Sequence, residues 1–114
     1  MSAPRNEIRI ERLKSKDAID RLFNQGEVEH KKNLLLRYIK ETDVSTLYVG
    51  VSVSKRRFKR AVDRNKIKRL LRVAIKTNED KLSFSGYFIL IYTGKRIPHT
   101  GNLIEQVKEV FDSL

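Results

Sequence analysis

The excess of positively charged side chains in this sequence is concentrated in one segment. The 114 residues include 25 Lys and Arg against 14 Asp and Glu, a formal charge of +11. Residues 55–76 hold 11 of the basic residues and one acid, Asp63, so this segment carries +10 and the remainder +1. A surface that serves only solubility intersperses its signs, whereas a concentrated basic stripe is typical of a polyanion site. The charge therefore predicts binding to a nucleic acid.

The spacing within this segment places the charges on one side of a helix. At 100° per residue, six polar side chains fall within an arc of about 140°, and four apolar ones fall within an adjacent arc of roughly 100°. Arginine is frequent here, and its planar guanidinium suits phosphate oxygens better than an ammonium does. A charged face that meets only solvent is the alternative, which the local charge disfavours. The polar set is Arg64, Asn65, Lys68, Arg69, Arg72 and Lys76, and the apolar set is Ile67, Leu70, Leu71 and Ala74.

Residues that could cut RNA without help are scattered. His30 and His99 are the only histidines, and nothing pairs them as acid and base. The carboxylates lack the clustering that a two-metal nuclease needs. The absence of cysteine excludes a thiol nucleophile, a Cys-based zinc site and a disulfide framework. We therefore predict no catalytic residue and no metal-binding residue in the protein itself.

The elements that must position the basic helix are predicted from capping residues and periodicity. Ser15 caps a first helix that stops at Gly26, and residues 46–53 alternate as a half-buried strand does. The basic helix runs from Phe58 or Ala61 to Thr77. Further strands are expected at 34–39, at 87–92 and, as a short one, near 27–30, and a last helix is expected to begin at Asn102 in a capping box with Glu105.

This order predicts one two-layer α+β domain over residues 1–114, with the sequence αβββαβα and a small mixed sheet. Residues 1–12 are expected to fray. No apolar run approaches the roughly 20 residues that span a bilayer, and the start of the chain lacks the apolar middle of a signal peptide. We expect a soluble protein of the cytoplasm with no membrane partner.

Three aromatic residues could serve either the core or a binding surface. Phe23 lies on the apolar side of the first helix with Ala18, Ile19 and Leu22, where a phenylalanine is more often core than stacking surface. Tyr38 and Tyr48 lie on predicted strands, where a tyrosine can be half-exposed.

The stretch 61–72, AVDRNKIKRLLR, resembles the RNR signature of the bacterial ribonuclease P protein family. The preceding VGVSVSK at 49–55 matches the strand that leads into that signature, and the flanks from Leu13 to Phe111 fit as well. Two features depart from the family pattern. Lys66 stands at the third signature position instead of Arg, and Ile19 and Leu34 stand where the family often has aromatic residues.

The resemblance implies a left-handed βαβ crossover, as in the second domain of a small-subunit ribosomal protein. It also implies a subunit that assists a catalytic RNA in Mg²⁺-dependent removal of the 5′ leader of precursor tRNA, with the Mg²⁺ held by the RNA and the protein inactive alone. The residues implied to contact the catalytic RNA are Arg57, Arg60, Arg64, Asn65, Lys66, Lys68, Arg69 and Arg72. Those implied to line a cleft for the single-stranded leader are Phe23, Tyr38, Lys55 and Arg56.

Three other functions fit parts of the sequence. A ribosomal or other structural RNA-binding protein fits the composition and the basic helix equally well. A DNA-binding regulator would place the basic helix in a major groove, but long apolar strands and the lack of a short turn between paired helices disfavour it, and no DNA partner is expected. A free-standing endonuclease would need residues that the chain does not group.

Overall fold

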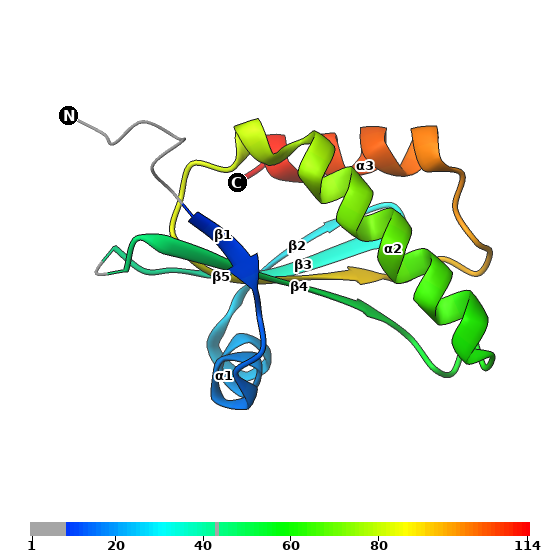
Figure 1. The fold of residues 1–114 in the computed structure, drawn as a ribbon, viewed down its shortest axis with the longest axis horizontal. Coiled ribbons are helices and arrows are strands. Elements are labelled where there is room, and N and C mark those ends of the chain that lie inside the picture. The colour runs from blue at the N-terminus through cyan, green and yellow to red at the C-terminus, as the bar shows by residue number, and fades with distance from the viewer. Residues whose placement is uncertain (1–8, 43) are drawn as a thin grey trace.

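A computed structural model describes residues 9–42 and 44–114 (Figure 1). Five strands form one sheet in the order β1-β4-β5-β3-β2, in which β1, β4 and β5 are parallel while β3 runs antiparallel to β5 and to β2. Helices α2 and α3 cover one face of this sheet, and α1 lies on the other. The elements are β1 Arg9–Arg12, α1 Lys16–Gln25, β2 Glu27–Lys31, β3 Leu34–Lys40, β4 Thr46–Val53, α2 Ala61–Thr77, the short 3₁₀ turn η2 Glu79–Lys81, β5 Gly86–Tyr92 and α3 Thr100–Asp112.

The crossover that carries the basic helix has the rare hand. In Figure 1, β4 lies in front of β5, both strands run towards the right, and α2 returns above the sheet between them. This path is left-handed, whereas about 98% of such parallel crossovers are right-handed. The fold class and the crossover predicted from the sequence are confirmed.

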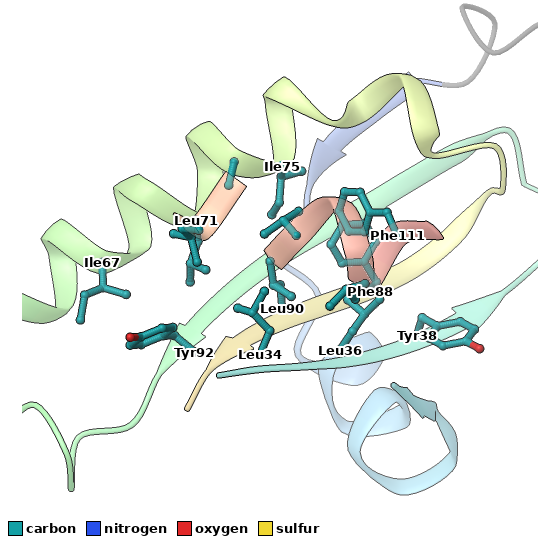
Figure 2. Packing of buried hydrophobic residues seen from close by; sticks show 14 of the residues in the cluster. Leu34, Leu36, Tyr38, Ile67, Leu71, Ile75, Phe88, Leu90, Tyr92 and Phe111 are labelled. Atoms are coloured by element: carbon teal, nitrogen blue, oxygen red, sulfur yellow. The ribbon is translucent and has the colours of Figure 1, made fainter. Parts of the chain in front are cut away.

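The larger part of the core lies between the sheet and the α2 and α3 helices. Leu71 and Ile75 reach down from α2 towards Leu90 of β5, and Phe88 meets Phe111 of α3 edge to face at 5.7 Å between ring centroids (Figure 2). The apolar positions of α2 recur at helical spacing and those of β5 are apolar on both faces, as a central strand requires. This packing fixes α2 on the sheet with its polar side turned outward.

The opposite face of the sheet is only partly covered. Its buried cluster consists of Leu13, Ala18, Leu22 and Ile89, all around α1. The side chain of Ser15 accepts a hydrogen bond from the Ala18 amide, 3.2 Å away, so the predicted N-cap of α1 is confirmed. A helix of ten residues cannot shield a five-stranded sheet, and half-buried side chains remain on this face.

Two sequence predictions about chain segments are wrong. Residues Arg9–Arg12 do not fray but form β1, which pairs in parallel with the start of β4; residues 1–8 lie outside the described part of the chain. All four β1 side chains are exposed, so no apolar alternation revealed this strand. Helix α3 begins at Thr100 with His99 as its N-cap, and the capping box predicted at Asn102 does not form.

Candidate RNA interface

The outward side of α2 carries exposed cations that form no ion pair with a carboxylate of the described residues. Within residues 9–42 and 44–114 the ion pairs are Arg21–Glu41 and Lys81–Asp112, and neither involves α2. Like charges stacked three or four residues apart repel one another, and an anionic partner removes that cost. We call these cations, together with the neutral Asn65 among them, the basic ridge; it consists of Asn65, Lys66, Lys68, Arg69, Arg72 and Lys76, of which only Lys68 is half-buried.

Arg64 differs from the other predicted contact residues. Its Nη1 donates to the backbone carbonyl oxygens of Phe58 and Lys59, both at 2.8 Å, and its side chain is half-buried. The remaining nitrogens of this guanidinium form no hydrogen bond with the described residues, so they are available to a phosphate. Arg64 therefore holds the β4–α2 loop against the first turn of α2 and borders the ridge at the same time.

The inner border of the ridge is apolar. Ile75 falls between Arg64 and Lys68 in the helical projection, and it is buried, with 4% of its surface exposed. It lines a groove of about 420 Å³ between α2 and the sheet edge, together with Arg72 and Lys76 on one wall and Ile10 and Val51 among the residues of the other. Helical periodicity alone did not reveal this groove, because its second wall comes from β1 and β4.

The fold brings together a second cationic surface, of which the sequence analysis named only the residues between β4 and α2. Tyr92 of β5 pairs with Val53 of β4 on one side and with Leu34 of β3 on the other. The loops next to these three residues therefore meet at one end of the sheet. The Thr93 amide donates to the Asn33 carbonyl oxygen at 2.8 Å, which ties two of these loops together. Segments 30–33, 54–60 and 93–99 contain no acid. We call this set the cationic end; its basic residues are Lys31, Lys32, Lys55, Arg56, Arg57, Lys59, Arg60, Lys95 and Arg96.

The cationic end includes four of the predicted contact residues. Lys55, Arg56, Arg57 and Arg60 are all exposed in the loop between β4 and α2. They lie next to the basic ridge because this loop leads directly into α2. The contributions of the β2–β3 turn and of the β5–α3 loop could have been found only from strand pairing, since each adds just two charges to the sequence.

Phe23 is a surface residue, contrary to the reading that favoured the core. Its side chain is 47% exposed. The guanidinium of Arg37, on β3, lies over the ring with its central carbon 5.1 Å from the centroid, within the range of a cation–π interaction. Arg37 also donates to the Phe23 carbonyl oxygen at 3.5 Å. Phe23 and Arg37 thus form a flat, exposed platform with a positive charge.

A strip of half-exposed sheet adjoins this platform. One step along the strands from Arg37 and Ile89, on the same face, four paired residues form a row across β2, β3, β5 and β4. None of the four is fully buried. The row leads towards the cationic end of the molecule. It consists of His30, Leu35, Ile91 and Ser52.

Tyr38 does not join this cleft, and the prediction that placed it there is wrong. Side chains alternate along a strand, and Tyr38 shares the α3 face with Leu34 and Leu36, where only 8% of it is exposed. Its ring lies 6.1 Å from that of Phe84. Burial, and then the nearby Glu27 and Glu29 carboxylates, raise the pKa of its hydroxyl. Tyr38 is a core residue on the opposite side of the sheet from Phe23.

Residues suited to metal binding are not grouped in the described chain. Over residues 9–42 and 44–114, no three His, Asp or Glu side chains gather where they could hold an ion. His30 lies on strand β2, whereas His99 lies in the loop before α3. Among the described helices, none is long and apolar enough to cross a bilayer.

Comparisons with known proteins agree with the geometry. Residues 8–113 match the family model described as ribonuclease P. The ribonuclease P protein component of Coprothermobacter proteolyticus is 35% identical over 101 residues, 88% of this chain and 81% of that protein. The one from Porphyromonas gingivalis is 39% identical over 75 residues, which span 64% of this chain but only 55% of the relative.

A solved structure supports the fold. The ribonuclease P protein from Thermotoga maritima superposes with a TM-score of 0.79 over 90% of this chain and 96% of that one, at 17% identity. At this identity the likeness concerns the fold alone. Because the family model spans nearly the whole described chain, the chain belongs to the ribonuclease P protein family.

Proposed function

We propose that this protein is the protein component of a ribonuclease P in the cytoplasm, where it binds the catalytic RNA and the 5′ leader of precursor tRNA. The observation that carries the proposal is the basic ridge, whose cations have no ion-pair partner in the described part of the chain and lie on a helix that the core fixes in place. Phosphate contacts supply affinity with little sequence information. Such contacts suit the docking of one large RNA.

The leader would bind on the other face of the sheet. Single strands are held by a cationic groove together with aromatic surfaces on which bases stack. The Phe23–Arg37 platform and the half-exposed row beside it supply the stacking surface, and Lys55 and Arg56 at the end of β4 supply charge. This arrangement reads no base edge in a fixed pattern, which suits a protein that must accept many leaders.

The chemical step would belong to the RNA. Mg²⁺ held by the RNA would activate the attacking water, and the protein would position the leader and neutralise phosphate repulsion where the two RNAs meet. Its contribution is therefore greatest at low Mg²⁺, where fewer free cations screen the phosphates.

Reconstitution tests this proposal. Cleavage of precursor tRNA by a bacterial ribonuclease P RNA is measured at low Mg²⁺, with and without the protein, for leaders of about one and about eight nucleotides. We expect the protein to be required for fast cleavage and to favour the longer leader. Phe23→Ala should remove most of the preference for the longer leader, because the lost stacking contributes about 1–3 kcal/mol per base.

Two outcomes would contradict the proposal. Cleavage by the protein without RNA would identify a free-standing endonuclease. Selective binding to ribosomal RNA, with no effect on the ribonuclease P RNA, would identify a structural RNA-binding protein.

A further inference from the structure

We propose that a hollow beside the stacked rings of Tyr48 and Tyr87 binds an unpaired nucleotide of RNA. The hollow lies on the same sheet face as Phe23 but on the other side of α1. Arg21, which covers Tyr87, and Phe23 are two residues apart in α1 and so point about 200° apart around the helix axis. The inference rests on the proposed function only in taking RNA as the partner.

The two tyrosines are aligned by the register of the sheet. Tyr48 of β4 and Tyr87 of β5 are direct partners, both half-buried, and their rings stack at 5.4 Å between centroids with 15° between planes. The Arg21 guanidinium lies over Tyr87 at 5.7 Å from the ring centroid and is held by an ion pair with Glu41. The faces of Tyr87 are thus taken by Tyr48 and Arg21, and Tyr48 ends the stack.

The space beyond the end of the stack has the size and the lining of a nucleotide site. The partner of Tyr48 on β1 is Glu11, so no third ring continues the row. A hollow of about 500 Å³ opens there, within the range of ligand pockets. Its lining residues are Glu11, Arg12, Leu13, Lys14, Ser15, Tyr48 and Tyr87.

The chemistry of this lining fits the three parts of a nucleotide. An aromatic base can stack on Tyr48 and continue the existing pair. Arg12 and Lys14 form no ion pair with the described residues and can meet a phosphate. The Glu11 carboxylate only accepts hydrogen bonds, so it suits the two-hydrogen exocyclic amino group of adenine, cytosine or guanine better than the single N3–H donor of uracil. A lipid or an acidic peptide would use the two cations but not the stack.

A titration of the full protein with a short single-stranded RNA tests the site directly. In ¹⁵N-labelled protein, pentaadenylate should shift the amide signals of residues 11–15, Tyr48 and Tyr87, and pentauridylate should shift them less. Shifts confined to α2 and to the surroundings of Phe23 and Arg37 would overturn the proposal.

Substitutions separate stacking from folding. Tyr48→Val keeps a good strand former and should weaken pentaadenylate binding about tenfold, near the lower limit for a stacked base. Tyr48→Phe keeps the ring and should bind as the parent does. Lys14→Gln should lower the slope of log affinity against log salt by about one unit. Tyr38→Phe, a tyrosine on the opposite face, is the matched control and should change nothing.

The nucleotide can come from the leader or from the catalytic RNA, and two assays distinguish these sources. If Tyr48→Val weakens binding of the protein to the catalytic RNA in the absence of precursor tRNA, the catalytic RNA supplies the nucleotide. If it weakens only the binding of precursors with long leaders to the assembled particle, the leader supplies it. Unchanged affinity in both assays overturns the site. A loss of leader binding in Phe23→Ala would then leave the proposed function standing.

Discussion

The two faces of the sheet differ in how completely they are covered, and this difference separates stability from recognition. On the α2 and α3 face, 18 described residues form one buried cluster. On the α1 face the cluster has four, and the side chains around it, among them Tyr48, Tyr87 and Ile91, are only partly buried. The covered face holds a helix rigidly with its charges outward. The open face leaves aromatic surface exposed to a partner.

Under the proposed function, this difference places the phosphate contacts and the base stacking on different faces of the molecule. Phosphates can be met by cations on the outside of a buried helix, because charge acts at a distance and needs no cavity. Stacking needs a flat exposed ring. The partly covered face offers two such rings: Phe23 beneath Arg37, and Tyr48 at the end of its stack.

The largest expected effect tests whether the covered face carries the stability. Phe88→Ala should lower the free energy of unfolding by about 3–5 kcal/mol, because a fully buried ring is lost and a cavity remains. Phe23→Ala, which removes the same side chain from the open face, should cost less than about 1 kcal/mol. Urea denaturation measures both values. Equal losses would mean that α1 and its platform belong to the same stability core.

The second effect tests whether the outward charges serve binding alone. Replacing Arg69, Arg72 and Lys76 together by Ala should reduce the salt slope for binding the catalytic RNA by about three units if each meets one phosphate. Thermal stability should hardly change, since all three are exposed and without ion pairs among the described residues. The control replaces Lys108 and Lys81 on the α3 side. A full salt slope in the triple variant would remove the ridge from the interface.

The sequence predicted the covered face better than the open one, because periodicity reports burial. The alternation over 46–53 matches β4 in its full length, and the basic helix begins at Ala61 and ends at Thr77 as expected. A last helix was also expected, and α3 buries Leu103, Val107, Val110 and Phe111 at helical spacing. Each of these signals is local, since one element shows its own buried stripe.

Features that depend on neighbouring strands were missed. Strand β1 has no buried side chain and exists because β4 offers it a partner. The family resemblance placed Tyr38 in the cleft. A tyrosine on a strand can face either side of a sheet, and Tyr38 points to the covered side because it alternates in step with Leu34 and Leu36. The cationic end is formed by three loops whose meeting depends on the register of β3, β4 and β5.

A smaller effect distinguishes Arg64 from the rest of the basic surface. Arg64→Ala should lower the free energy of unfolding by about 1–2 kcal/mol, because the Phe58 and Lys59 carbonyl oxygens lose a charged donor. Arg72→Ala changes an exposed side chain of the same helix, so it should lower the free energy of unfolding by less than about 0.5 kcal/mol. Both should weaken RNA binding. If the two variants unfold at the same urea concentration, Arg64 is a contact residue only.

The smallest effect concerns the hydroxyl of the core residue Tyr38 at alkaline pH. Burial raises the pKa of this group above its ordinary value of 10.0, so above about pH 10 the unfolded chain releases the proton and the folded chain keeps it. Folding stability must therefore fall as the pH rises through this window. Tyr38→Phe removes the titrating group without breaking a hydrogen bond among the described residues, so its stability should decline less between pH 9.5 and 11. Parallel declines for the variant and the parent would mean that Tyr38 ionises as freely as an exposed tyrosine, and the assignment of this side chain to the covered face would fail.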